Sequence, residues 1–306
     1  MTMTDLDSLE LPELFRVLVD PNHLERLISL AAAEDLGDKG DITTQMMVNP
    51  LETVSAEIVT RHAGVLAGTP VLDVVLRRLA PELSWWWAME DGASIDPGDV
   101  ICRIGGPLAR LLPVERILLN MLGRLSGVAT LTHRYVSEVE GTGVSLCDTR
   151  KTTPGFRELE KYAVRCGGGV MHRCGLHDAI LVKDNHVGML SADEFAGLLA
   201  RDLPPARQAH EPSFVQIEVD DFEQLEAIFS IATGLVDIIL LDNMSPEKMR
   251  VAVTRRDEVA PGILLEASGG ITLETVRGVA ESGVDRISVG ALTHSATQLD
   301  FGIDLR

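Results

Sequence analysis

The chain has 306 residues, of which 45% are hydrophobic and 24% are charged, so it can form a large core and lacks the bias of disordered proteins. Its formal net charge of −19 excludes non-specific nucleic-acid binding, because such binding needs a basic surface that releases counterions. The apolar runs are far shorter than the about 20 residues that span a bilayer, and the amino terminus carries acids where a signal peptide carries basic residues. We therefore expect a cytoplasmic protein that binds neither membranes nor nucleic acid.

The four cysteines are too few and too irregularly spaced for a disulfide framework, so we expect reduced thiols. A zinc site is the alternative for one group of neighbouring residues, namely Cys166, His172, Cys174 and His177. No CxxC pair is present, so we reject that interpretation.

Basic residues gather in one stretch of this acidic chain. From Asp148 to Lys183 there are seven lysine or arginine residues and four acids, so the stretch carries +3 and the remainder −22. Such an island would concentrate an anionic small molecule in one place. Three basic residues lie four apart on one expected helix: Arg157, Lys161 and Arg165. They fit either this role or a solvated helix face, and the sequence leaves both open.

The first part of the chain predicts a small domain of helices and strands. Asp20 as cap, Pro21 at the first position and Gly37 at the end mark a helix with apolar residues at helical spacing. Strands are expected at 53–60 and at 100–104, the second between two turn segments rich in glycine and proline.

Three adjacent tryptophans, Trp85, Trp86 and Trp87, lie within this region. Because alternate side chains on a strand point to opposite faces, we expect them to serve packing rather than to form one ligand platform. A long helix with one apolar stripe begins at Pro113 and connects the two halves of the chain.

From about residue 144 short apolar runs alternate with helix-like segments. The runs are 144–147, 179–182, 214–217, 238–241, 263–265 and 286–289. Apolar strands with helices between them predict a parallel sheet buried on both faces, and a barrel is its natural closure. Polar or glycine residues follow the runs: Arg150, Lys151, Lys183, Glu218, Asp242, Ser268, Gly269, Gly270 and Gly290. Since loops at the carboxyl ends of barrel strands build active sites, we expect these residues to lie there together.

Several long motifs in this half are distinctive. They read DTRKTTPG from Asp148, KYAVRCGGG from Lys161, HR at 172–173 and LVKDNH from Leu181. Flanking segments belong to the same series: EDLG from Glu34, GDITT from Gly40, ER at 115–116, LLDN from Leu240, SGGI from Ser268 and SVGALTH from Ser288. Motifs in this order, from about residue 30 to 305, closely resemble those of quinolinate phosphoribosyltransferase, a type II phosphoribosyltransferase.

The resemblance implies an α/β fold: an incomplete parallel α/β barrel, similar to a TIM barrel, with a smaller α+β helix-and-sheet domain. We expect the amino-terminal domain at 1–127, with residues 295–306 returning to it, and the barrel domain at 128–294. A homodimer or larger even assembly with shared active sites is also implied. The expected reaction joins quinolinate to phosphoribosyl pyrophosphate and gives nicotinate mononucleotide, CO₂ and pyrophosphate in NAD biosynthesis.

Quinolinate has two adjacent carboxylates, so its pocket needs fixed cations, and arginine matches a carboxylate with paired donors whereas lysine supplies a point charge. By resemblance the positions around quinolinate are Thr149, Arg150, Lys151, His172, Arg173 and Lys183. The position of Arg116 reaches in from the neighbouring subunit in that family. The expected catalytic residues are Lys151, Lys183, Glu218 and Asp242.

The second substrate carries a 5′-phosphate and a pyrophosphate. Main-chain amides for them are expected at two strand ends that lead into helices, at Ser268, Gly269, Gly270, Gly290 and Ala291. Tight turns are the alternative role of these glycines. Mg²⁺ should accompany the pyrophosphate, held mostly by phosphate oxygens and water. By resemblance Glu218 and Asp242 contact the ribose hydroxyls and the metal, and they are placed to stabilise positive charge on the ribose.

One position departs from the family pattern, because Met171 stands where asparagine is usual before His172 and Arg173. Three alternatives to the expected activity remain: a paralogue of the same fold that serves molybdenum uptake, a barrel aldolase in which Lys183 forms an imine, and a non-catalytic anion-binding protein.

Overall fold

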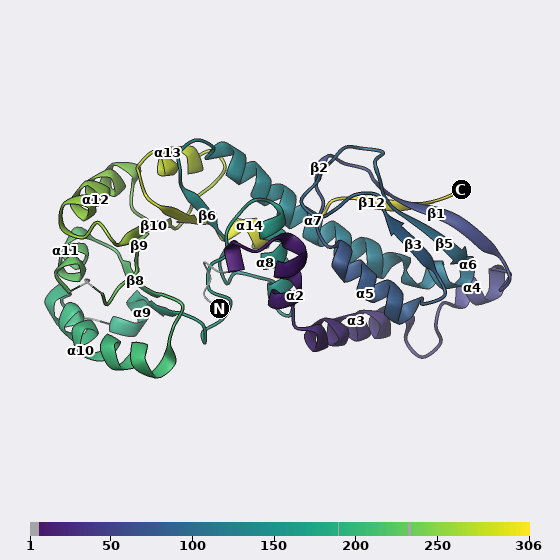
Figure 1. Cartoon of the computed structure of the whole chain (residues 1–306), viewed down its shortest axis with the longest axis horizontal. Coiled ribbons are helices and arrows are strands. Elements are labelled where there is room, and N and C mark those ends of the chain that lie inside the picture. Colours follow the sequence, from purple (N-terminus) through teal and green to yellow (C-terminus); the bar gives the residue numbers. More distant parts are fainter. Residues whose placement is uncertain (1–5, 189, 232–233) are drawn as a thin grey trace. The chain divides into compact units, whose positions relative to one another are not determined.

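The computed structural model describes residues 6–188, 190–231 and 234–306, which form two compact units (Figure 1). The amino-terminal unit comprises Leu6–His133, Thr152–Gly168 and Leu292–Arg306, and the barrel unit comprises Arg134–Lys151 and Gly169–Ala291. No helix within the described residues is both long enough and apolar enough to cross a membrane.

The first boundary falls after His133 rather than after residue 127, and residues 292–306 return to the amino-terminal unit, close to the expected 295–306. Residues 152–168, expected in the barrel, belong to the amino-terminal unit because their helix α8 (Arg157–Cys166) packs there. The ring of Tyr162 meets that of Phe15 edge to face with centroids 5.1 Å apart, and its hydroxyl donates to Asp91 at 2.8 Å. Residues 1–5, which the expected domain included, lie outside the described residues.

The amino-terminal unit is built on an antiparallel sheet in the order β12-β1-β5-β3. Its strands are β1 (Thr53–Thr60), β3 (Ser84–Trp87), β5 (Val100–Pro107) and β12 (Phe301–Leu305), and a separate ladder joins β2 (Gly64–Val65) to β4 (Ser94–Ile95). Both expected strands of this region are confirmed, and the second extends to Pro107.

Among the helices of this unit, α3 (Pro21–Leu36) begins and ends at the residues that the sequence marks, whereas α7 (Glu115–Glu138) begins two residues after the expected Pro113. The other helices that lie wholly in this unit are α2 (Leu11–Leu18), α4 (Ile42–Met47), α5 (Thr69–Leu79), α6 (Leu108–Leu111) and α8. Two helices, the long α7 and the short α14 (Ala291–His294), each contain a boundary between the two units. The Asp20 side chain accepts the amide of Asn22 at 2.9 Å, and Gly37 ends α3 with a φ of 49°. Pro113 itself lies in a 3₁₀ turn (Leu112–Val114) before α7.

The tryptophans alternate as a strand requires. The indole N–H groups of Trp85 and Trp87 both donate to Asp73 Oδ1, at 2.6 and 2.9 Å, whereas Trp86 is exposed and stacks with Arg103 at 5.5 Å. The packing interpretation of these residues is therefore confirmed.

The basic residues of α8 do not form a solvated face. Lys161 is fully buried, and Arg157 and Arg165 are half-buried. Arg165 Nη2 donates to the carbonyl of Asp7 at 2.8 Å, and Arg157 Nε donates to the hydroxyl of Thr152 at 3.0 Å. The alternative of a solvated face is wrong, because these side chains are buried or half-buried and two of them make hydrogen bonds within the amino-terminal unit.

The barrel unit contains a six-stranded, wholly parallel sheet in the order β6-β11-β10-β9-β8-β7. The strands are β6 (Ser145–Cys147), β7 (Ile180–Val182), β8 (Val215–Val219), β9 (Ile238–Asp242), β10 (Leu264–Ser268) and β11 (Arg286–Ser288). The accompanying helices are α9 (Asp184–Val187), α10 (Ala192–His210), α11 (Phe222–Ile231), α12 (Pro246–Val259) and α13 (Val276–Ala280), and in Figure 1 α10 to α13 lie outside the sheet. Among the described strands β6 does not pair with β7, so the barrel is incomplete, as expected.

Candidate active site

The carboxyl ends of the barrel strands carry the predicted residues. Because the sheet is parallel, these ends meet at one edge. Thr149, Arg150 and Lys151 follow β6, Lys183 follows β7, Glu218 lies in β8, Asp242 ends β9, Ser268 ends β10 before Gly269 and Gly270, and Gly290 and Ala291 follow β11. The barrel unit thus gathers every predicted site residue except Arg116.

Lys183 and Glu218 form an ion pair between neighbouring strands. Val182 is in register with Ile217, so the next residues of β7 and β8 lie side by side, and Lys183 Nζ donates to Glu218 Oε2. The Glu218 side chain is only 7% exposed, while that of Lys183 is 41% exposed. A nearly buried carboxylate is therefore paired with a cation that is itself partly exposed to solvent.

The segment that contains Asp242 and Asn243 is in close contact with the glycine loop after β10. Asp242 is in register with Ser268, and its Oδ2 accepts Asn243 Nδ2 at 2.6 Å. The amide of Asn243 donates to the Ser268 carbonyl at 3.0 Å. Gly269 has a φ of 94°, and a Cβ there would overlap the Asn243 side chain. Glycine is required at this position because the backbone approaches the Asp242 segment closely.

His172 is buried and held on both ring nitrogens. The amide of Arg173 donates to its Nδ1 at 2.8 Å, so we assign the ring proton to Nε2. Nε2 lies 2.8 Å from Oε1 of Gln216 and 3.4 Å from Oε1 of Glu266. The His172 amide donates to Asp148 Oδ1 at 2.8 Å, so both the ring and the main chain of this residue are fixed.

Glu266 carries a negative charge inside the sheet. Its side chain is fully buried, and Arg286 Nε donates to its Oε2 at 2.9 Å. Burial opposes ionisation, but the contacts of His172 and Arg286 outweigh it and hold the pKa of Glu266 below its ordinary value. The carboxylate therefore stays charged, and its Oε1 lies 3.4 Å from His172 Nε2.

Arg150 and Arg173 bring two positive charges close together. Arg173 is only 6% exposed, and one of its Nη1 hydrogens goes to the Ala179 carbonyl at 3.2 Å. Burial, and then the charge of Arg150, lower the pKa of Arg173. Within the described residues, the buried Nε atoms of both arginines have no hydrogen-bond partner. Two such donors are typical of a site that is completed by an anionic ligand.

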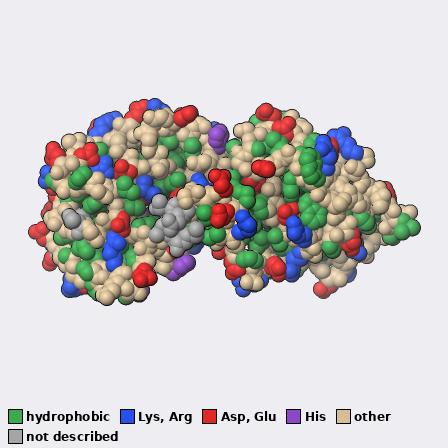
Figure 2. Space-filling view, viewed as in Figure 1, with side chains coloured by type: hydrophobic (Ala, Val, Ile, Leu, Met, Phe, Trp, Pro, Cys, Tyr) green, Lys and Arg blue, Asp and Glu red, His purple; other side chains and the backbone are tan. Residues whose placement is uncertain are grey.

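Arg116 is the one predicted residue in the amino-terminal unit. It is the second residue of α7, its side chain is 65% exposed, and its Nη2 lies 3.4 Å from Glu115 Oε1. On the face shown in Figure 2, basic and acidic side chains are interspersed, so the local excess of basic residues does not appear there as one basic patch.

Sequence reasoning missed four residues that hold the site together: Gln216, Asn243, Glu266 and Arg286. A signal existed for two of them. Gln216 and Glu266 interrupt apolar strands, and Gln216 lies two residues before Glu218, hence on the same face of β8. A polar residue inside a buried strand requires a partner, which here is His172.

Comparisons with known proteins identify related sequences and folds. Residues 41–126 match the model of the quinolinate phosphoribosyl transferase N-terminal domain, and residues 128–304 match that of the C-terminal domain. A nicotinate-nucleotide pyrophosphorylase [carboxylating] of Mycobacterium leprae (strain TN) is 42% identical over 280 residues, covering 91% of this chain and 95% of its own. A probable enzyme of the same name from Bacillus subtilis (strain 168) is 39% identical, covering 93% and 94%. The nicotinate-nucleotide pyrophosphorylase structure from Francisella tularensis superposes with a TM-score of 0.84 at 33% identity, covering 94% and 98%.

Proposed function

The chain belongs to the quinolinate phosphoribosyl transferase family, and we propose that it transfers the phosphoribosyl group of phosphoribosyl pyrophosphate to quinolinate. The products are nicotinate mononucleotide, CO₂ and pyrophosphate, a step of NAD biosynthesis. The observation that carries this proposal is that the buried Nε atoms of Arg150 and Arg173 have no hydrogen-bond partner within the described residues, in the barrel unit that also holds the Lys183–Glu218 ion pair.

We assign quinolinate to the cationic part of this edge. Its two carboxylates would receive the free Nε–H groups of Arg150 and Arg173, with Lys183 close to the reacting ring. The remaining proposed contacts are Thr149, Lys151, His172 and, from a second subunit, Arg116. A pocket of this kind favours a dicarboxylate, because one carboxylate would leave buried cations unpaired.

The 5′-phosphate is assigned to the two glycine loops. Gly269 and Gly270 have φ values of 94° and 60°, and Ser268 ends β10 at the same edge. Gly290 and Ala291 follow β11, where α14 begins. Main-chain amides at such strand ends are suited to phosphate oxygens.

Glu218 and Asp242 are assigned to the transition state. As the bond between the ribose C1′ and the pyrophosphate oxygen breaks, positive charge develops on the ribose, and a nearby carboxylate stabilises it more than the neutral ground state. The pyridine nitrogen then bonds to C1′ and becomes cationic. That ring accepts the electron pair left when the 2-carboxylate departs as CO₂, and a proton replaces it. Lys151 and Lys183 complete the proposed catalytic set by neutralising the anionic groups.

Mg²⁺ is the proposed cofactor. Within the described residues there is no cluster of three or more side chains of the kind that holds a metal alone, but Glu218 and Asp242 offer two carboxylates at one edge. This donor set fits magnesium, which usually binds through one or two carboxylates with substrate phosphates and water. When bound with pyrophosphate, it would neutralise the departing negative charge.

We further propose a cytoplasmic homodimer, or a larger even assembly, in which Arg116 completes the partner's site. The exposure of Arg116 supports this, as do apolar side chains exposed on and after α4: Ile42, Met46, Met47 and Leu51. All four cysteines are free thiols, as a reducing compartment requires. Membrane and nucleic-acid partners are not part of the proposal.

The alternatives are less well supported. The names of the relatives do not favour the molybdenum-associated paralogue. An imine-forming lysine must be neutral, whereas Lys183 Nζ donates to Glu218. A plain anion-binding protein gains nothing from two carboxylates at the edge that holds its cations.

The direct test is to incubate the purified chain with quinolinate labelled in its 2-carboxylate, phosphoribosyl pyrophosphate and Mg²⁺. We expect labelled CO₂ and nicotinate mononucleotide in equal amounts, and neither product without phosphoribosyl pyrophosphate. An Arg150→Gln variant should lose turnover, whereas Arg255→Gln, which changes an exposed ion pair with Glu226, should retain it. No nucleotide from the wild-type protein would refute the proposed function.

A further inference from the structure

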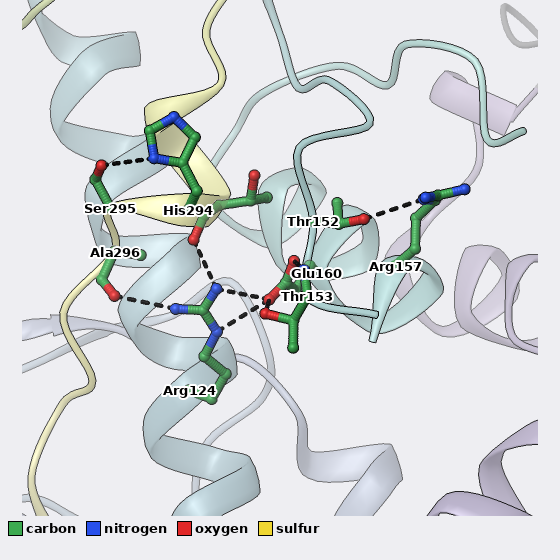
Figure 3. Close-up of polar contacts among 9 residues, drawn as sticks. Arg124, Thr152, Thr153, Arg157, Glu160, His294, Ser295 and Ala296 are labelled. Carbon is green, nitrogen blue, oxygen red and sulfur yellow. Dashed lines mark hydrogen bonds and ion pairs between the residues drawn. The ribbon is translucent and has the colours of Figure 1, made fainter. Parts of the chain in front are cut away.

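A buried ion pair in the amino-terminal unit lies outside the residues that the reaction uses. Arg124 of α7 donates from Nε and Nη2 to Glu160 Oε1, at 3.0 and 2.6 Å (Figure 3). The Glu160 side chain is fully buried and that of Arg124 is 17% exposed. An ion pair so well shielded needs additional hydrogen bonds to offset its desolvation, and both partners have them.

The carboxylate of this pair fixes the segment that follows the cationic loop. The amide of Thr153 donates to Glu160 Oε2 at 3.0 Å and its hydroxyl donates to Oε1 at 2.8 Å. Thr152 is held separately, since its hydroxyl accepts Arg157 Nε at 3.0 Å (Figure 3). Lys151, a proposed quinolinate ligand, is the residue immediately before this segment.

The guanidinium of the pair fixes a second segment, near the carboxyl end of the chain. Arg124 Nη2 donates to the Thr293 carbonyl at 2.6 Å, and Nη1 donates to the Ala296 carbonyl at 3.0 Å. The following residues lie against the same helix, where Gly123 accepts the amide of Leu299 at 3.0 Å. A Cβ at Gly127 would overlap the Thr297 carbonyl, so the segment and α7 are in close contact.

We propose that Arg124 and Glu160 are positioning residues that hold two substrate-binding loops in register with each other. Glu160 holds Thr153, two residues after Lys151, and Arg124 holds Thr293, two residues after Ala291, a proposed phosphate ligand. A single guanidinium–carboxylate pair therefore anchors the chain just beyond the quinolinate loop and just beyond the phosphate loop. This inference rests on the proposed function for the identity of the two ligands, but not for the anchoring itself.

A matched structural pair exists in the barrel unit. Arg256 Nη1 donates to Asp285 Oδ2 and to the Ile263 carbonyl, at 2.6 and 2.7 Å, and Asp285 accepts the amide of Leu265 at 2.7 Å. It has the same chemistry, an arginine and a carboxylate that also bind the main chain. It lies at the amino-terminal ends of β10 and β11, the edge opposite to the candidate site, and serves as the control.

The test compares Arg124→Lys and Glu160→Gln with Arg256→Lys and Asp285→Asn. All four should lower the melting temperature, because each weakens a shielded ion pair. In hydrogen exchange, peptides covering 149–156 and 290–298 should exchange faster in both Arg124→Lys and Glu160→Gln, and neither peptide should change in the control variants. In turnover assays below the melting transition, the KM values for quinolinate and for phosphoribosyl pyrophosphate should both rise by about 10-fold or more in the first two variants. The control variants should stay within about 2-fold of the wild-type KM values.

The outcomes separate the two proposals. Equal KM changes in test and control variants at equal loss of melting temperature would show that Arg124 and Glu160 serve stability alone. A rise for one substrate only would overturn the coupling of the two loops. If the wild-type protein forms no nucleotide, the proposed function fails, and hydrogen exchange alone then tests the positioning role. Unchanged exchange of the two peptides in the Arg124 and Glu160 variants overturns that role, and faster exchange of both peptides supports it.

Discussion

Replacing Glu266 by glutamine tests whether the buried charge beneath the candidate site stabilises the fold. Glutamine keeps the shape of the side chain and can still accept hydrogen bonds, but it removes the negative charge that Arg286 Nε reaches at 2.9 Å. Arg286 is then left with its positive charge in a position where its side chain is only 16% exposed. Breaking a buried ion pair by removing one partner costs about 3–5 kcal/mol, and the partial exposure of Arg286 places the expected loss at about 3 kcal/mol.

Urea unfolding at pH 7 measures this loss. The control is Glu226→Gln, which removes the carboxylate of an exposed pair whose Arg255 side chain is 40% exposed, and we expect no resolvable change there. If the two variants lose the same stability, the buried charge contributes no more than a surface charge, and the reasoning from burial fails.

The same variant predicts a pH dependence. The folded pKa of Glu266 lies below its ordinary value of 4.5, so its stabilisation is fully present above that value and is lost as the pH falls toward the folded pKa. The difference in unfolding free energy between wild type and Glu266→Gln should therefore be constant from neutral pH down to about pH 5 and shrink at lower pH. A difference that grows on acidification would contradict the lowered pKa.

Further predictions concern the reaction. Nicotinate should react with a kcat/KM at least about 100-fold below that of quinolinate, because a missing carboxylate leaves pocket cations unpaired; comparable turnover of both acids would remove the dicarboxylate argument. Glu218→Gln and Asp242→Asn should lower kcat more than they weaken quinolinate binding measured by calorimetry, and the reverse pattern would exclude them from stabilising the transition state. Arg116→Ala and Lys183→Ala should each be inactive alone, yet mixing equal amounts should restore about a quarter of the sites, since half the dimers are mixed and each has one intact site. No recovery despite confirmed subunit exchange would place Arg116 outside the partner's site.

Local patterns predicted the elements of the fold well, because they carry their own boundary signals. Each of the six apolar runs became a barrel strand within about three residues of its expected limits, since apolar composition and following polar or glycine residues mark strand ends. The assignment of residues 152–168 could not be obtained in this way. It depends on Tyr162 meeting Phe15 and Asp91, which lie more than 70 positions away, and no local pattern encodes such a contact.

The site was predictable where its residues end strands and not where they lie inside them. Lys183 and Glu218 follow or close apolar runs, and the parallel register brings them together. Glu266 lies in the middle of a strand, so its charge is visible in the sequence, but its partners are not. Arg286 comes from the neighbouring strand and His172 from a loop, and only the folded sheet shows that all three meet.

The unusual Met171 illustrates how such hidden partners decide the effect of a substitution. Met171 is fully buried and stands where asparagine, whose amide can both donate and accept hydrogen bonds, is usual next to His172. The imidazole, however, is held by groups that do not depend on residue 171: the Arg173 amide on Nδ1, and Gln216 with Glu266 on Nε2. Since these contacts constrain both ring nitrogens, the ring keeps its orientation and its assigned tautomer without the asparagine. The substitution is therefore compatible with an intact site, because the buried strands provide the orientation that the neighbouring amide would otherwise supply.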